Sequence, residues 1–475
     1  MPEESSVRMS QTIVIVGGGA TGVGAAYHLH KQVKAGSIDA KIILVERDAA
    51  LGGKAKTDVV DGMVIEHGPD SYLAYKPWFG NLAKELGLST VGTNPHCKST
   101  YILHKGRMES LPVGMNIMIP TEVWPFLKTR LLTPLGKLRA GLEPFMPIKK
   151  DDADESIGSF VGRRFGRDVL EHVAGPLMGG IHGGDWENVS IKCTFPSFPK
   201  MEKEGGSLLL QGWKNKANKP KSTTGSAFQT VQAGLQSALL KAAEVASESV
   251  DFRTSTSVTA LNLVDGKYDV TLSTGEQFVA DAVILAVPAY VAADLVKSFR
   301  ADVAEKLNEI PYNNSCVVAV AYNKADIKHP LNATGFLVPS GEPLEISAST
   351  WISTKWPHAA PDDKVLLRCF VGRGPGKDWT KESDEAIMAT VKDSLKQTMG
   401  IEANPILTKI FRWPKSMAVY RVGHLALMDK VDSLMAQQPG LYLAGAAYRG
   451  VGLGDCVREG TQAADKAMKH LGWKA

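Results

Sequence analysis

Residues 13–26 read IVIVGGGATGVGAA, and this stretch decides the fold class of the chain. A continuous apolar run meets a glycine cluster and then an alanine-rich segment, which predicts a buried parallel strand, a tight turn and a helix. Gly17, Gly19 and Gly22 match the dinucleotide-binding fingerprint, whose three glycines make the turn, admit a pyrophosphate and let the helix pack on the strand. Glycine-rich turns occur in many α/β proteins, so the fingerprint alone also fits a purely structural turn.

A second predicted strand, residues 41–46 (KIILVE), ends in Glu46. This acid follows Gly22 at close to the roughly 20 positions expected for a carboxylate that binds ribose hydroxyls. Gly52, Gly53 and Lys54 come soon after it, and they would place backbone N–H groups and a cation near phosphates. Together these residues predict a Rossmann-type domain that binds a dinucleotide.

The segment 47–54, RDAALGGK, resembles the R-x-x-x-x-G-G-[RK] signature of the glutathione reductase-like flavin proteins, in the branch that holds amine oxidases and related desaturases. Plain NAD dehydrogenases lack this second glycine pair, so the resemblance shifts the expected cofactor from NAD to FAD. Residues 63–73 predict a short strand that runs into a turn at Gly68 and Pro69. This turn fits a close approach to the isoalloxazine ring, although Gly-Pro also marks ordinary turns.

Near the end of the chain, residues 440–446 (GLYLAGA) predict another strand and turn, and residues 450–456 (GVGLGDC) lead into a helix. Such a helix can aim its N-terminus at the flavin, where the positive end of its dipole stabilises the charge that develops on reduction. Strands expected within residues 257–287 match the later strands of a flavin domain, and Val258 is expected near the adenine.

The composition predicts a large folded core, because 44% of the 475 residues are hydrophobic and 22% are charged. The net charge of +4 suits an anionic substrate or a membrane surface and is too small to predict nucleic-acid binding. The five cysteines form neither a disulfide framework nor a zinc spacing, so we expect no metal and a cytoplasmic location. No apolar run reaches the roughly 18 residues of a spanning helix.

Residues 107–150 combine apolar and basic residues in an amphipathic pattern. Such helices lie on a membrane interface or, more commonly, cap a core with a wet basic face. The end of this stretch, residues 144–152, predicts a linker.

Two helices joined near Gly166 are expected within residues 155–180, followed by a glycine-rich turn that holds His182. This histidine fits a general acid–base or a turn residue bonded to backbone. Residues 200–226 predict a mobile surface loop, and residues 301–405 predict a second domain with an antiparallel or mixed sheet.

Almost from end to end, the chain resembles the bacterial oxygen-dependent porphyrinogen oxidases. The narrower likeness lies in EHGPDSYL (66–73), GGIHGGD (179–185) and GAAYRGVG (445–452), whereas the other glycine motifs are common to the flavin superfamily. The resemblance implies non-covalent FAD and hydride transfer from a meso carbon to flavin N5, repeated until the macrocycle is aromatic, without a catalytic side chain. It implies O2 as acceptor, H2O2 as product and a role in heme biosynthesis, with coproporphyrinogen III preferred to protoporphyrinogen IX.

The resemblance also implies a mixed α/β and α+β fold with a glutathione reductase-like FAD-binding domain. Three interleaved regions are expected: an FAD-binding domain (10–75, 226–300 and 405–475), a mixed-sheet substrate domain (76–105, 190–225 and 301–404) and a helical domain that could touch a membrane (106–189).

The motifs and the resemblance together give a set of expected site residues. Those expected to bind FAD are Gly17, Gly18, Gly19, Ala20, Thr21, Gly22, Glu46, Arg47, Gly52, Gly53, Lys54, Gly68, Pro69, Asp70, Ser71, Val258, Trp413, Gly445, Gly450, Val451, Gly452 and Leu453. Those expected in the substrate pocket are Gly180, Ile181 and His182, with Lys76, Arg107, Arg368 and Arg412 as candidate partners of the substrate carboxylates. Gly454 stands where the family commonly has proline, and His182-Gly183 stands where Tyr-Ala is usual, which puts the pocket shape in doubt.

Two other functions stay open. An amine oxidase or carotenoid desaturase uses the same scaffold, and Trp413 is a candidate member of the aromatic pair that an amine oxidase places beside its flavin. A non-catalytic flavin-binding module would hold FAD that no substrate bleaches. The expected partners are a porphyrinogen and O2; contact with the inner face of the cell membrane and with the next heme-pathway enzyme also stays open.

Overall fold

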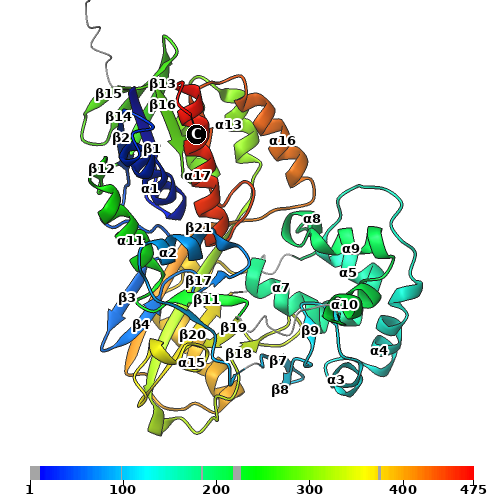
Figure 1. The fold of residues 1–475 in the computed structure, drawn as a ribbon. Helices are drawn as coiled ribbons and strands as arrows, with labels where there is room; N and C mark the ends of the chain where they lie inside the picture. Colours follow the sequence, from blue (N-terminus) through cyan, green and yellow to red (C-terminus); the bar gives the residue numbers. More distant parts are fainter. Residues whose placement is uncertain (1–10, 98, 183–185, 218–225, 373–375, 475) are drawn as a thin grey trace, which may run out of the picture.

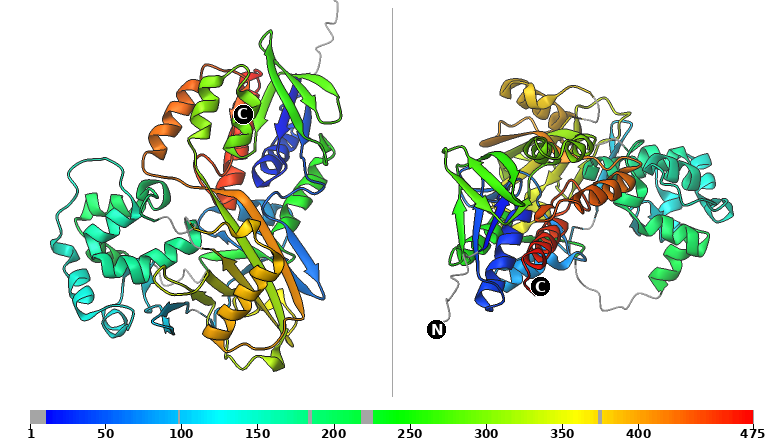
Figure 2. Two further views of the ribbon diagram at one scale, coloured as in Figure 1. Left: turned by 180° about the vertical axis from the view of Figure 1, so that it is seen from behind. Right: turned by 90° about the horizontal axis from the view of Figure 1, so that it is seen from above.

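The computed structural model describes residues 11–97, 99–182, 186–217, 226–372 and 376–474. Three parts are visible in Figure 1: a parallel sheet flanked by helices, a mixed sheet below it and a helical part beside them. The views from behind and from above in Figure 2 show the same separation of the helical part from the two sheets.

The first part is built on five parallel strands in the order β12-β2-β1-β16-β22. The apolar run of residues 13–16 forms the central strand, where it is almost inaccessible to solvent, as a parallel strand covered on both faces requires. The strands are β1 (Gln11–Val16), β2 (Ala40–Val45), β12 (Val250–Arg253), β16 (Ala282–Leu285) and β22 (Leu441–Leu443).

Alternate residues of these strands enter two different cores, because side chains of a strand alternate between its faces. Ile13 and Ile15 pack against the helices α1 (Ala20–Lys34), α11 (Leu235–Ala246), α17 (Leu453–His470) and α2 (Pro77–Glu85). Val14 and Val16 face the antiparallel strands β13 (Val258–Val264), β14 (Lys267–Leu272) and β15 (Gln277–Ala280) and the helices α12 (Ala289–Val296), α13 (Ala301–Asn308) and α16 (His424–Met435).

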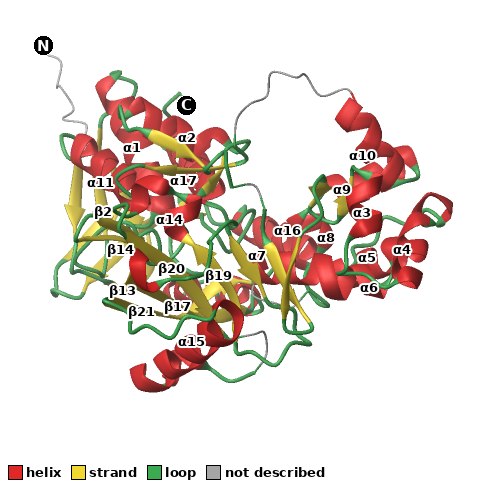
Figure 3. Cartoon of the chain, turned by 90° about the horizontal axis from the view of Figure 1, so that it is seen from below, coloured by secondary structure: helices red, strands yellow, loops and turns green. Residues whose placement is uncertain are grey.

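The second part is a seven-stranded sheet in the order β21-β17-β20-β19-β18-β7-β8, in which only β18 and β7 pair in parallel. Figure 3 shows α15 (Asp384–Met399) outside this sheet, where Ile387, Val391 and Leu395 are buried against it. The strands are β21 (Leu407–Ala418), β17 (Tyr312–Asn323), β20 (Lys364–Val371), β19 (Ile346–Trp351), β18 (Gly335–Leu337), β7 (Tyr101–His104) and β8 (Arg107–Ser110).

Short elements join the two sheets. A hairpin, residues 57–66, packs on the mixed sheet, where Met63 and Ile65 share a core with Ala319 and Leu366. A three-stranded sheet and short helical turns make the other connections. These elements are β3 (Thr57–Val60), β4 (Met63–Glu66), β5 (Tyr72–Leu73), β11 (Phe228–Val231), β6 (Thr90–Gly92), η3 (Lys324–Asp326), α14 (Ile352–Lys355), η4 (Pro357–Ala359) and η5 (Trp379–Lys381).

The helical part surrounds a core of its own, in which Phe160 and Phe165 are buried. Its elements are β9 (Met115–Asn116), β10 (Ile119–Pro120), α3 (Val123–Lys128), α4 (Pro134–Gly141), η1 (Glu143–Phe145), α5 (Ile157–Phe165), α6 (Arg167–Val169), the π-helical turn η2 (Leu170–Ala174), α7 (Gly175–His182), α8 (Ile191–Thr194), α9 (Ser197–Gly205) and α10 (Leu208–Ala217).

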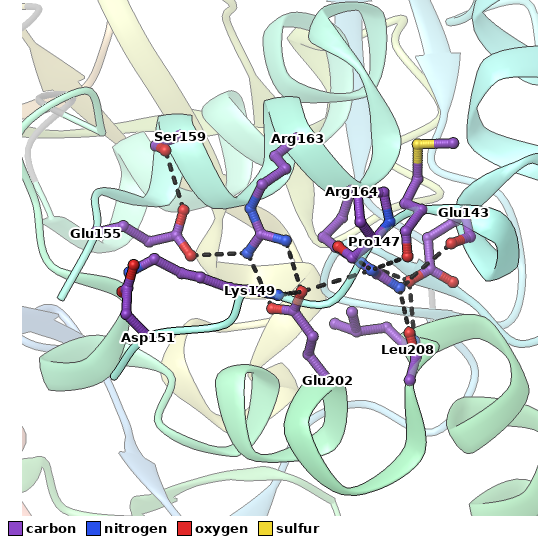
Figure 4. Close-up of polar contacts among 12 residues, drawn as sticks. Glu143, Pro147, Lys149, Asp151, Glu155, Ser159, Arg163, Arg164, Glu202 and Leu208 are labelled. Atoms are coloured by element: carbon purple, nitrogen blue, oxygen red, sulfur yellow. Dashed lines mark hydrogen bonds and ion pairs between the residues drawn. The ribbon is translucent and has the colours of Figure 1, made fainter. Parts of the chain in front are cut away.

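A buried network of ion pairs holds this part together (Figure 4). The fully buried Arg164 pairs with the fully buried Glu143 and also donates to Met146 O at 3.0 Å. Arg163 bridges Glu155 at 2.8 Å and Glu202 at 2.5 Å. Arg164 donates to the carbonyl oxygens of Met146 and Pro147, so this part of the stretch expected as a linker, residues 144–152, is held against α5.

The packing departs from the expected division of the chain in five places. Helices α2 and α13 pack in the two cores of the parallel sheet, whereas we assigned residues 76–105 and 301–404 to the substrate domain. Residues 107–110 form β8 and residues 407–418 form β21, both in the mixed sheet, whereas we assigned them to the helical and FAD-binding regions. Helices α8 to α10 share the core of the helical part, whereas we assigned residues 190–225 to the substrate domain. The loop expected over 200–226 is wrong for residues 200–217, which lie almost entirely in α9 and α10; residues 218–225 lie outside the described residues.

Candidate active site

The turn from β1 into α1 has the geometry that the fingerprint requires. Gly17 has a φ of +108°, and a Cβ on Gly22 would lie 1.8 Å from the carbonyl oxygen of Gly17, so α1 can start this close to β1 only with glycine. A Cβ on Gly19 would meet only Gly53 Cα, at 3.9 Å. Protein atoms therefore leave the space beside Gly19 free, and a pyrophosphate would need this space.

The second glycine pair lies against the first motif. Gly52 N donates to Gly18 O at 2.8 Å, and Gly53 lies directly beside Gly19. Helix α1 has Gly19 as its N-cap residue and no side chain that caps its first N–H groups. These N–H groups, which include those of Ala20 and Thr21 in the first turn, suit an anion.

Glu46 is fixed at the end of β2, as the ribose assignment requires. Its Oε2 accepts from Gly18 N at 2.5 Å, and its Oε1 accepts from Asp48 N at 2.8 Å. The neighbouring Arg47 points to solvent, with its Nε 3.6 Å from Asp48. The backbone at Thr256 donates to Glu46 O at 2.9 Å, so the start of β13 with Val258 lies near the acid.

A compact loop at residues 68–71 lies between the two sheets. A Cβ on Gly68 would lie 2.1 Å from Lys54 O, and Arg368 donates to Gly68 O. Lys355 pairs with Asp70 at 2.7 Å, and Ser71 Oγ donates to the same carboxylate at 2.8 Å. Burial raises the pKa of Asp70, but the adjacent cations of Lys355 and Arg368 outweigh it and hold this pKa well below its usual range. Asp70 is therefore an anchor of the loop.

The loop borders a small cavity of about 20 Å³, which is room for one water molecule. Glu66, Asp70, Arg368 and His358 contribute its polar lining. Glu66 accepts from Leu235 N at 2.6 Å, and burial raises the pKa of Glu66 to about 7.

Two further contacts tie the loop to its surroundings. Trp413 Nε1 donates to His67 O at 3.0 Å, just before residue 68. The Lys54 ammonium group donates to Ser416 O. Trp413 and Ser416 both lie on β21, so the mixed sheet supports the loop from below.

The C-terminal glycine motif reaches the same place. A Cβ on Gly445 would lie 3.7 Å from Thr21 Oγ1, in the first turn of α1. Gly450 has a φ of +150°, and Gly452 is the N-cap residue of α17, again without a capping side chain. Val451 and Leu453 flank this cap. Three segments far apart in sequence thus lie close to one another where the parallel sheet meets the mixed sheet.

Comparison with known proteins gives this geometry a family. Residues 20–468 match the model of the protein family described as "Flavin containing amine oxidoreductase". The chain belongs to this family.

Known relatives place the chain within the family more narrowly. The coproporphyrinogen III oxidase of Bacillus subtilis (strain 168) is 34% identical over 97% of this chain and 98% of its own length. The enzyme of the same name from Staphylococcus aureus (strain NCTC 8325 / PS 47) is 33% identical over 98% of this chain and 100% of its own. A crystal structure from Exiguobacterium sp. 255-15, assigned as a protoporphyrinogen oxidase, has a TM-score of 0.86 at 32% identity and covers 98% of this chain and 99% of that one.

These findings confirm the predicted fold class and show that this flavoprotein is an FAD-dependent oxidoreductase of the porphyrinogen oxidase group. The residues present fit FAD. The free space at Gly19, the uncapped N-terminus of α1 and the fixed carboxylate of Glu46 suit a pyrophosphate and a ribose. The individual contacts of the cofactor stay a prediction.

The basic residues that we expected at the substrate carboxylates are dispersed in this flavoprotein. Lys76 pairs with the buried Asp455 at 2.5 Å, and Arg412 pairs with Asp384 at 2.6 Å. Arg368 binds the loop at Gly68, as described above. Arg107 lies exposed on β8 and makes no ion pair within the described part of the chain. The structure thus gives three of the four candidates a partner inside the protein.

Gly180, Ile181 and His182 form the last turn of α7, where we expected a glycine-rich turn after the helix. Their side chains lie outside the described residues, as do residues 183–185. Gly454, the departure from proline, lies in the first turn of α17, where a Cβ would be 2.8 Å from Lys76 O.

The sequence alone did not single out the residues that support the site from outside the glycine motifs. Lys355 holds Asp70, and Tyr420 Oη accepts from Gly450 N at 2.8 Å. Asp70 and Gly450 are not sequence neighbours of Lys355 and Tyr420. An isolated lysine or tyrosine belongs to no sequence motif, so no signal in the sequence pointed to these two residues.

Proposed function

We propose that this flavoprotein oxidises coproporphyrinogen III to coproporphyrin III, with O2 as electron acceptor and H2O2 as product. The full-length similarity to bacterial enzymes named coproporphyrinogen III oxidase carries this proposal. Protoporphyrinogen IX is the second candidate substrate, because the similar structure from Exiguobacterium is assigned to that reaction.

The site supports an oxidation that needs orientation and exclusion of water more than a strong base. When bound, FAD supplies the hydride acceptor. The chain's own residues fix the phosphate and ribose end through Gly19 and Glu46 and hold the loop at Asp70 rigidly. Pyrrole N–H protons can leave by tautomerism, so the absence of an assigned catalytic base does not weigh against this reaction.

Anaerobic mixing tests the proposal directly. The purified yellow protein is mixed with coproporphyrinogen III, protoporphyrinogen IX or a primary amine, and loss of flavin absorbance is followed. We expect bleaching by the porphyrinogens, fastest with coproporphyrinogen III, and release of H2O2 when O2 is admitted. Bleaching by the amine alone would indicate an amine oxidase, and no bleaching by these substrates or a carotenoid would indicate a non-catalytic flavin-binding module.

We also propose that the outer face of α3, α4 and η1 contacts the inner face of the cell membrane. Trp124 is 73% exposed, Leu135 77% and Phe145 79%. Exposed Lys128 and Arg130 lie between Trp124 and Leu135 in the sequence. Apolar side chains surrounded by cations suit an anionic lipid surface. Within the described residues, no helix is long and apolar enough to cross a membrane.

Vesicle sedimentation tests this second proposal. We expect binding to anionic vesicles at low salt, weaker binding at high salt, and loss of binding in a Trp124→Ser/Leu135→Ser variant. Val59→Ser, which removes an exposed apolar side chain from β3, is the matched control. Protein that stays in the supernatant at low salt would exclude lipid. In that case, binding of the next heme-pathway enzyme to this face would show that the exposed apolar side chains contact a protein instead of a membrane.

A further inference from the structure

The segment 419–424, which follows β21, is joined to the helical part through its main chain. Ser190 N donates to Tyr420 O at 2.8 Å, and Val189 and Arg421 form an isolated β-bridge. Ile157 N, at the start of α5, donates in turn to Val189 O at 2.8 Å. The segment is therefore tied through residues 189 and 190 to the start of α5 in the helical part.

The side chains of the same segment hold the chain between β22 and α17. Tyr420 Oη donates to Ala446 O at 2.9 Å and accepts from Gly450 N at 2.8 Å. His424 Nε2 lies 2.9 Å from Tyr448 O. The two buried rings of Tyr420 and His424 stack with their centroids 4.1 Å apart. Two side chains thus engage three backbone groups of residues 446–450.

We propose that Tyr420 is a positioning residue that fixes residues 446–450, and with them the N-terminus of α17, relative to the helical part. This inference rests on the placement of the flavin beside Gly445–Leu453. A phenol suits the task because one hydroxyl group can accept from one backbone N–H and donate to a backbone carbonyl. Gly450 has a φ of +150°, a backbone conformation that residues with a side chain rarely adopt, so the hydrogen bond to Tyr420 supports an unusual turn.

The Tyr420→Phe variant tests this inference, because it removes the hydroxyl and leaves the ring stack and the main-chain pairing in place. Tyr312→Phe is the matched control: Tyr312 Oη also accepts from a backbone N–H, that of Ala289, at 2.8 Å, but outside the 446–450 segment. Hydrogen exchange of the holoprotein should become about fivefold faster over residues 445–453 in Tyr420→Phe, the effect of one lost hydrogen bond. In Tyr312→Phe only the amide of Ala289 should exchange faster.

Flavin properties give a readout that a merely structural role would not change. We expect the dissociation constant for FAD to rise about fivefold in Tyr420→Phe, with a shifted flavin absorption spectrum, while Tyr312→Phe matches the unsubstituted protein. Unchanged exchange over 445–453, or faster exchange with unchanged FAD affinity and spectrum, would overturn the inference. If Tyr420→Phe does not fold, His424→Phe keeps a stacked ring, loses the contact with Tyr448 O and tests the same loop. The proposed reaction is tested separately, by the loss of flavin absorbance when the unsubstituted protein is mixed with a porphyrinogen.

Discussion

The Gly19→Ala substitution separates the folding of this flavoprotein from its binding of FAD. Gly19 has φ −74° and ψ −175°, a conformation that alanine adopts without strain, and its Cβ would meet no protein atom closer than 3.9 Å. An N-cap alanine costs about 1 kcal/mol relative to a better cap, so the free energy of unfolding should fall by no more than that. The added methyl group would occupy the space that we assign to the pyrophosphate.

The expected loss of FAD affinity is much larger than the loss of stability. Displacing the pyrophosphate from the N–H groups of α1 should raise the dissociation constant at least tenfold, which is about 1.4 kcal/mol. Urea unfolding of the FAD-free protein and titration with FAD, followed by flavin fluorescence, measure the two effects. Gly341→Ala is the control, since a Cβ there meets nothing within 4 Å and its φ is not positive.

The contrast with Gly22→Ala sharpens the test. Its Cβ would lie 1.8 Å from Gly17 O, so this variant should lose folded protein as well as FAD. If Gly19→Ala binds FAD as tightly as the unsubstituted protein, Gly19 does not face the pyrophosphate and the placement of the cofactor is wrong.

Three further substitutions test the buried charges. Glu143→Gln removes the carboxylate that pairs most closely with the fully buried Arg164 and leaves only Glu202, at 3.5 Å. It should lower the free energy of unfolding in urea by about 3 kcal/mol, and a loss below about 1 kcal/mol would contradict the importance of the network. Burial raises the pKa of Glu66 from 4.5 to about 7, so the folded state keeps a proton that the unfolded chain releases, and stability falls as the pH rises through this range. Glu66→Gln should remove this fall and be up to about 3 kcal/mol more stable at pH 8, and parallel pH profiles of the two proteins would refute this. Lys355→Met removes one cation that lowers the pKa of Asp70. The folded protein should therefore lose less stability when the pH falls below about 4. If the free energy of unfolding falls equally in both proteins over this pH range, Lys355 does not have this role.

The sequence was most informative where function depends on the backbone. The apolar run at residues 13–16, the three fingerprint glycines and the acid at the end of the second strand predicted a parallel sheet with a nucleotide site, because each depends on local steric requirements. The sequence was least informative where the local composition predicts a loop but tertiary packing forms a helix. Residues 200–217, rich in Lys and Gly, lie almost entirely in helices because Leu208 and Leu209 are buried in the helical core.

By itself, the sequence determined the parallel sheet through its apolar runs and glycine spacing. The resemblance of its short motifs to known flavin proteins indicated FAD and the family, because such motifs need no distant partner. Only the tertiary structure decided which charges are free. Arg368, a candidate for a substrate carboxylate, is instead buried against Gly68 and Asp70, and Lys76 is paired with Asp455. Tyr420 and Lys355 likewise acquire their roles from partners that lie far from them in the chain. The physical reason is that the partner of a charge or a hydroxyl is set by which segments the fold brings together, and a single sequence does not record those contacts.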